Sequence, residues 1–176
     1  MELNSKKWII IRSALYLVIF ILLHYAYDWF PNPVFAVFSG IDESVYQHMK
    51  IAFYAYIILI VIEFLIFRKK IERSQAYFFT RLFSTVIIPW IVFVLFFIGR
   101  ALYPYEFPEI IEIIYALGIT FLVGIVISFI ELEFDEVEYS KRFQILLVIL
   151  LIILIMEFTV FTFRLPWHDI FADPYA

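Results

Sequence analysis

The stretch from Ser39 to Lys50, SGIDESVYQHMK, places an Asp, a Glu, a His and a Lys between two very apolar segments. Imidazole and carboxylate groups are the ligands that zinc, iron and manganese take in proteins, and they also transfer protons. Cysteine is absent, which excludes disulfides, thiolate catalysis and Cys-ligated metals. The chemistry open to this chain therefore rests on histidine and carboxylate side chains.

We predict that a metal site, if the chain has one, is built from His24, His48, Glu112 and Glu157. Three further side chains are candidate neighbours of this site: Asp28, Glu43 and His168. Inserting a carboxylate into an apolar span costs at least ~2.5 kcal/mol of free energy, so such groups normally face other helices or a wet cavity. Glu157 lies inside the last span and is included for this reason. The ion would be a divalent metal such as zinc. The alternative is that His24 and Asp28, four residues apart on one helix face, only hydrogen-bond between helices.

The spacing around His48 indicates which residues share a face. Ser44, His48, Ala52 and Ala55 form a stripe of small residues that favours close approach of another helix. On a helix that begins at residue 43, the side chains of Glu43 and His48 diverge by about 140°. We therefore expect Glu43 and the preceding Asp42 to cap the helix, and we do not expect Glu43 and His48 alone to share a ligand.

The elements that position these residues are membrane spans. Of 176 residues, 65% are hydrophobic and only 17% are charged, which is typical of a membrane protein and not of a soluble domain. Five apolar runs, each about 20 residues or longer, are long enough to cross a bilayer as helices. The predicted fold class is all-α, a single transmembrane domain over residues 1–176 with spans at about 8–30, 43–67, 77–101, 109–131 and 143–164.

The distribution of basic residues predicts the orientation. Cytoplasmic loops carry the excess of Lys and Arg, which places the N-terminus inside and the C-terminus outside, in the plasma membrane. The segment 31–42 is too short to span and is expected to be interfacial or re-entrant. The inner side then holds ten of the 13 basic residues, namely Lys6, Lys7, Arg12, Arg68, Lys69, Lys70, Arg73, Arg81, Lys141 and Arg142.

Other polar positions have structural interpretations. Glu112, Ala116, Thr120, Gly124 and Ser128 recur every four residues and are expected to face protein. Glu63 is expected to extend to the inner membrane surface or to pair with Lys70. Residues 131–143, ELEFDEVEYSKRF, are interpreted as a solvated inner loop.

The run from His24 to Phe67 resembles an uncharacterised family of small multi-pass prokaryotic membrane proteins, a domain of unknown function. The matching residues are His24, Asn32-Pro33, Phe38-Ser39, Glu43-Ser44-Val45, His48 and Lys50, and the tail FADPYA is similar to the family's ending. Asp42 and Tyr46 depart from the pattern, which has Asn and Trp there. The resemblance implies a multi-pass α-helical membrane protein and assigns no activity.

Three functions follow from these observations. The leading interpretation is a structural or accessory membrane subunit, in which the His/Glu cluster holds helices together. The first alternative is a metal-dependent membrane-embedded enzyme acting on a lipid-like substrate. The second is a small ion- or proton-coupled transporter with Glu112, Glu157 and His24 as a relay. The expected partners are the lipid bilayer and a membrane-protein partner or second copy, and no nucleic acid, since no basic face is present.

Overall fold

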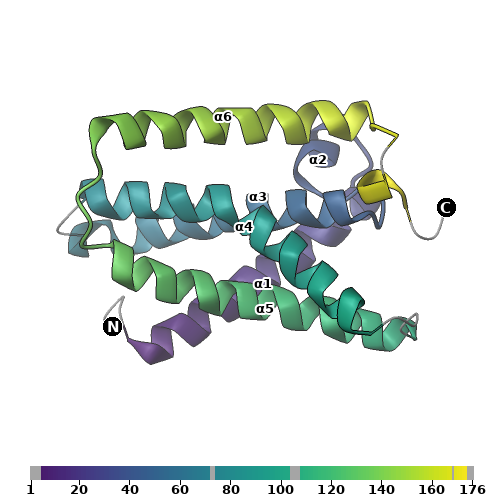
Figure 1. Cartoon of the computed structure of the whole chain (residues 1–176), viewed down its shortest axis with the longest axis horizontal. Helices are drawn as coiled ribbons and strands as arrows, with labels where there is room; N and C mark the ends of the chain where they lie inside the picture. Colours follow the sequence, from purple (N-terminus) through teal and green to yellow (C-terminus); the bar gives the residue numbers. More distant parts are fainter. Residues whose placement is uncertain (1–4, 72–73, 104–107, 168, 174–176) are drawn as a thin grey trace.

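The computed structural model describes residues 5–71, 74–103, 108–167 and 169–173, and every regular element in them is helical. Five helices are long and apolar enough to cross a membrane, which confirms the predicted all-α class. Their bounds differ from the predicted spans by at most three residues at either end. The elements are α1 (Lys6–Trp29), α2 (Pro33–Phe38), α3 (Val45–Phe67), η1 (Arg68–Lys70), α4 (Ser74–Leu102), α5 (Glu109–Phe134), α6 (Lys141–Phe163) and η2 (Asp169–Phe171) (Figure 1).

Side-chain caps explain where several helices begin. The hydroxyls of Ser5, Ser44 and Ser140 accept hydrogen bonds from the backbone N–H three residues later, at the starts of α1, α3 and α6. Each cap satisfies a backbone donor that has no partner within the helix. Asn32 caps the six-residue α2 in the same way, and Pro33 follows at the first helical position, where a missing N–H costs nothing. The segment predicted as a short non-spanning connection thus contains a short helix.

The long helices pack as a bundle in which α1 crosses the others obliquely (Figure 1). α1 packs on α5 and α3, and α4 packs on α3, α5 and α6. The core between α1 and α3 includes the fully buried Tyr16, Ala52 and Ala55, as the small-residue stripe on α3 predicted. A second core, formed by Tyr46, Phe53, Phe158 and Phe171 among others, joins α3, α6 and η2.

The helix α6 shows how the outer surface is built. Its buried side chains are Leu147, Leu154, Phe158 and Thr162, which form one stripe. The remaining faces carry exposed apolar side chains such as Ile149, Ile152 and Met156. A soluble protein rarely exposes so large a continuous apolar surface, whereas a lipid-facing helix requires one.

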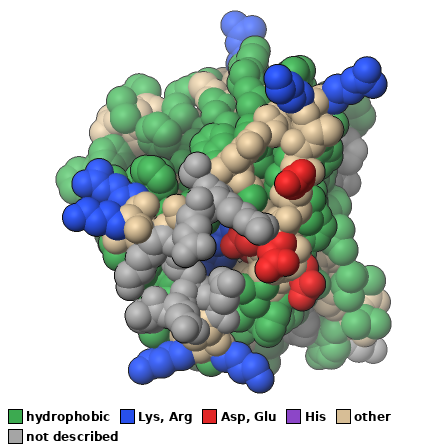
Figure 2. Space-filling model, turned by 90° about the vertical axis from the view of Figure 1, so that its left-hand side faces the viewer, with side chains coloured by type: hydrophobic (Ala, Val, Ile, Leu, Met, Phe, Trp, Pro, Cys, Tyr) green, Lys and Arg blue, Asp and Glu red, His purple; other side chains and the backbone are tan. Residues whose placement is uncertain are grey.

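The bundle has two distinct ends. At the N end, α1, α4 and α6 begin and α3 and α5 end, and at the C end lie α2, the end of α4, the start of α5 and η2 (Figure 1). In a view onto the N end along the long axis of the bundle, Lys and Arg side chains lie around the margin, and Asp and Glu side chains lie nearer the centre (Figure 2). The two termini lie at opposite ends, as an odd number of spans requires.

Candidate metal centre

His24 and His48 meet at the C end of the bundle, where the last turns of α1 face the first turn of α3. Their Nε2 atoms lie 3.3 Å apart. The Oε2 atom of Glu43 lies 3.4 Å from Nε2 of His24 and 3.6 Å from Nε2 of His48. Among the described residues, these three side chains are the group whose ligand atoms converge closely enough to hold one metal ion.

The three distances match the edge lengths of a tetrahedral metal site. With Zn–N and Zn–O bonds of about 2.0–2.2 Å, tetrahedral angles place the ligand atoms about 3.3–3.5 Å from one another. The observed edges of 3.3, 3.4 and 3.6 Å fall in or next to this interval. A tetrahedral ion just above the centre of the triangle would therefore reach all three ligand atoms with little side-chain movement.

Glu43 joins the site because it lies outside the helix. α3 begins at Val45, and Ser44 is its N-cap, so Glu43 does not follow the helical rotation that separates residues five apart. The sequence expectation that Glu43 and His48 diverge was wrong for this reason. Asp42 and Glu43 were both expected to cap α3, but the cap is Ser44. Asp42 supports this cap, because its Oδ1 accepts a hydrogen bond from the backbone N–H of Ser44 at 2.9 Å.

The orientation of His48 is fixed by its other ring nitrogen. Nδ1 lies 2.9 Å from the backbone carbonyl of Ser44, and because a carbonyl oxygen only accepts, Nδ1 is the protonated nitrogen. The lone pair of Nε2 then points at the cluster, which is the arrangement that metal-binding histidines adopt. In His24 the buried Nδ1 has no hydrogen-bond partner among the described residues. Phe20 packs beside both rings, with its centroid 6.4 Å from each.

Charge and exposure differ between the ligands. The hydrogen bond from His24 and the charges of both imidazoles hold the pKa of Glu43 below its usual value, although partial burial opposes this. The side chains of His24 and His48 are 20% and 24% exposed, and that of Glu43 is 44% exposed. The site is therefore walled by apolar side chains on the bundle side and is open to solvent on the Glu43 side.

The other predicted ligands do not join this group. Glu157 lies on α6 near the C end, where its backbone carbonyl accepts a hydrogen bond from the Tyr46 hydroxyl at 2.9 Å. Glu112 is half-buried on α5, and Asp28 is exposed at the end of α1. His168 lies outside the described residues.

The sequence did not single out the second ionic group, which lies at the N end. Glu63 does not extend to the surface: it is 2% exposed and lies 2.7 Å from Arg12, while the side chain of Lys70, its other expected partner, is not described. Glu131, expected in a solvated loop, belongs to α5 and is also 2% exposed. The available signal was Arg12, a charge well inside an apolar span that needed a buried partner.

Comparison with known protein families gives one result for the whole chain. A model of a family of unknown function (DUF6512) matches residues 1–176, in agreement with the resemblance of the His24–Phe67 run to an uncharacterised membrane family. Neither the comparison with curated proteins nor that with solved structures gave a match. The function must therefore be argued from the site.

Proposed function

The chain belongs to DUF6512, a family of unknown function, and we propose that it is a multi-pass plasma-membrane protein that binds one divalent metal ion, zinc fitting best, through His24, Glu43 and His48. The observation that carries this proposal is the triangle of ligand atoms with edges of 3.3, 3.4 and 3.6 Å. Two neutral imidazoles and one carboxylate suit Zn²⁺ and leave one tetrahedral position for water or a substrate.

Membrane insertion is supported by the surfaces of the helices. The five long helices are apolar, and their outward faces carry aliphatic and aromatic side chains that water would not stabilise. The distribution of basic residues supports an inner N end and an outer C end. In this orientation the metal site lies at the outer membrane surface.

The open position suggests the activity to test. Zinc with three protein ligands lowers the pKa of a bound water to near 7 and thereby supplies a hydroxide nucleophile. Trp29, Phe30 and Val34 are each more than half exposed beside this end of the bundle. A site with this apolar margin favours a lipid-like substrate, so hydrolysis of an amphiphile is the reaction class that we propose to assay.

The accessory-subunit function remains as the second candidate because of one contact. Without a metal, the 3.3 Å approach of the two Nε2 atoms is itself a hydrogen bond that ties α1 to α3. The proton relay of Glu112, Glu157 and His24 has less support, since the two carboxylates do not join the group around His24.

Elemental analysis of detergent-purified protein separates these candidates. We expect about one zinc per chain after purification without chelator, and loss of that metal in His24→Ala, His48→Ala and Glu43→Gln. Glu157→Gln is the matched control, because it removes a carboxylate at the same end of the bundle and should retain the metal. Size-exclusion profiles would verify that each variant is folded.

Two outcomes would contradict the metal proposal. Wild-type protein that binds no metal when dialysed against micromolar zinc would leave only the hydrogen-bonding role. Metal retained equally in both histidine variants would place the ion elsewhere in the chain.

A further inference from the structure

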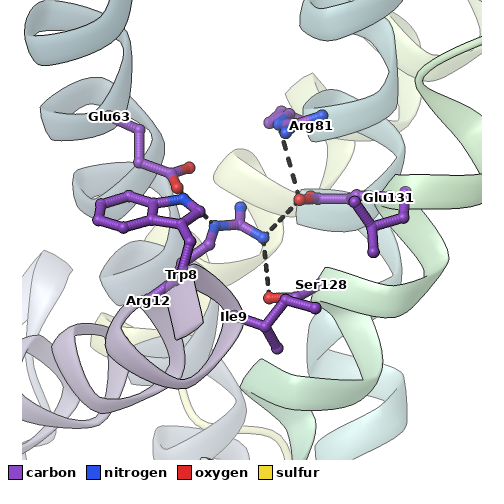
Figure 3. A pocket seen from close by; sticks show the side chains of 8 residues that line it. Trp8, Ile9, Arg12, Glu63, Arg81, Ser128 and Glu131 are labelled. Atoms are coloured by element: carbon purple, nitrogen blue, oxygen red, sulfur yellow. Dashed lines mark hydrogen bonds and ion pairs between the residues drawn. The ribbon is translucent and has the colours of Figure 1, made fainter. Parts of the chain in front are cut away.

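A chain of five alternating charges runs through the N end of the bundle. Its members, in spatial order, are Glu63, Arg12, Glu131, Arg81 and Asp135, which we call the charge chain. Nε of Arg12 lies 2.7 Å from Oε1 of Glu63, and Nη1 of Arg12 lies 2.5 Å from Oε2 of Glu131. Nε of Arg81 lies 3.6 Å from the same Glu131 oxygen, and its Nη1 contacts Asp135. Arg12 thus lies between Glu63 on α3 and Glu131 on α5, and Arg81 on α4 approaches the same Glu131 (Figure 3).

The side chains of the charge chain are almost completely buried. The side chains of Glu63 and Glu131 are 2% exposed, and Arg12 and Arg81 are 5% and 8% exposed. Asp135, in the turn after α5, is 22% exposed. Charges buried to this extent are stable only when they are paired, because the surrounding protein and lipid solvate them poorly.

The pairing is incomplete by one charge. The charge chain contains two guanidinium groups and three carboxylates, which leaves one excess negative charge among these five described residues. The described polar side chains that contact the two arginines from outside the charge chain are neutral: Tyr56 and Ser128 each accept a hydrogen bond from Arg12, and Tyr77 lies under the guanidinium of Arg81. They can redistribute the charge but cannot cancel it.

The three carboxylates differ in how well they are satisfied. Glu131 lies between both arginines and also accepts a hydrogen bond from the Tyr56 hydroxyl. Asp135 reaches solvent and contacts Arg81. Glu63 has a single arginine contact, from its Oε1 to Arg12. Both Glu63 oxygens, like Oε2 of Glu131, are buried and make no hydrogen bond among the described residues, and Glu63 lines a small pocket with Arg12, Arg81 and Glu131 (Figure 3).

We propose that Glu63 is a proton-binding site, which takes up and releases one proton through the pocket at the N end. A proton on Oε2 removes the excess charge at the position where a carboxylate is least compensated. Buried membrane carboxyl groups that exchange a proton are the usual basis of proton-coupled function. The proposal is independent of the metal centre, which lies at the other end of α1.

Asp135 is the competing position for the proton. Burial raises the pKa of this carboxyl, against the opposing effect of Arg81. The groups that face Glu63 are Arg12 on α1, Arg81 and Tyr77 on α4, and Glu131 on α5, with Tyr56 on its own helix. A test must therefore identify which carboxyl group carries the proton.

Dicyclohexylcarbodiimide provides this test, since this lipophilic reagent modifies protonated carboxyl groups in apolar surroundings. Purified protein in lipid vesicles would be treated between pH 5 and 9, digested, and mapped by mass spectrometry. We expect the adduct on Glu63, decreasing at least tenfold as the pH rises, and no adduct on Glu131. An adduct mainly on Asp135 or Glu131, or none on Glu63 at any pH, overturns the proposal.

Charge balance supplies a second variant that leaves Glu63 intact. Asp135→Asn removes one carboxylate, so the remaining two match the two guanidinium groups and Glu63 no longer needs a proton. We expect its labelling at pH 7 to fall severalfold. Glu133→Gln, an exposed change on the same segment, is the matched control and should label as the wild type does. Unchanged labelling in Asp135→Asn would contradict the charge-balance argument.

Discussion

The two ring nitrogens of His48 link the start of α3 to the candidate metal centre. Nδ1 bonds to the carbonyl of Ser44, and the hydroxyl of Ser44 accepts from the backbone N–H of Gln47 at 3.3 Å. Ser44 therefore caps α3 with its side-chain hydroxyl and orients the imidazole of His48 with its backbone carbonyl. A disturbance of this first turn should act on both the stability of the helix and the position of Nε2.

A pair of cap substitutions tests this link at the residue scale. Ser44→Ala and Ser140→Ala each remove a cap with a hydroxyl-to-N–H distance of 3.3 Å, and each should cost about 0.5–2 kcal/mol. Only Ser44→Ala should also weaken zinc affinity, by roughly the 10–100-fold typical of supporting residues around a metal. Thermal unfolding and zinc titration with a competing chelator would measure the two effects. Equal zinc affinity in both variants would show that the first turn of α3 does not orient His48.

What the sequence could predict about this site depended on helix boundaries. His24 and His48 were expected to converge because both lie at the same end of adjacent spans, and they do. Glu43 was assigned a different face because the span was taken to begin at residue 43, two residues before α3 starts. Because Ser44 caps α3, Glu43 lies before the helix and its direction is set by the loop. A hydropathy pattern does not locate a helix start to within two residues, so it could not predict this direction.

At the scale of elements, the row of polar or small residues on α5 (Glu112, Ala116, Thr120, Gly124 and Ser128) explains how closely α1 and α5 approach. Thr120 and Ser128 are buried, and their hydroxyls bond back to carbonyls of their own helix. A Cβ atom added at Gly124 would lie 3.0 Å from the backbone Cα of Ser13 on α1. The absence of a side chain at residue 124 thus permits direct backbone contact between the two helices.

Two glycines on α5 provide a matched test of this contact. Gly124→Ala should force α1 and α5 apart and destabilise the fold by about 1–3 kcal/mol. Gly118→Ala meets no atom within 4 Å and should be neutral or stabilising by about 0.5–1 kcal/mol, because alanine restricts the unfolded chain. Thermal unfolding in detergent would compare the variants. Equal midpoints would mean that the helices adjust to the extra methyl group.

The short α2 is held by a lysine that the sequence did not assign to any role. Nζ of Lys50 is fully buried and donates to the Ala36 carbonyl at 2.7 Å and to the Thr162 hydroxyl at 2.8 Å. It therefore joins α2 and α6 to the start of α3. Asn32 and Pro33 set the beginning of α2, so several residues that carried the family resemblance have identifiable structural roles next to the candidate metal centre.

At the scale of the whole molecule, composition was sufficient to predict the number of long helices but not their neighbours. A helix such as α6 is apolar on nearly every face, so no hydrophobic periodicity marks the side that meets another helix. The packing of α1 on α5, which are far apart in sequence, depends on small residues and buried ion pairs instead. For the same reason the charge chain was visible only after folding brought Arg12, Glu63 and Glu131 together.

The orientation of the bundle decides which solution each polar site contacts. Basic side chains surround the N end (Figure 2), so we expect this end in the cytoplasm, with the charge chain facing inward and the metal centre facing outward. Because the chain has no natural cysteine, single cysteines at Glu138 and Ala172, both exposed, can report on the two ends. An impermeant maleimide added to intact cells should label Ala172→Cys at once and Glu138→Cys only after permeabilisation. The reverse result would place the N end outside, and zinc would then have to reach His24 and His48 from the cytoplasm.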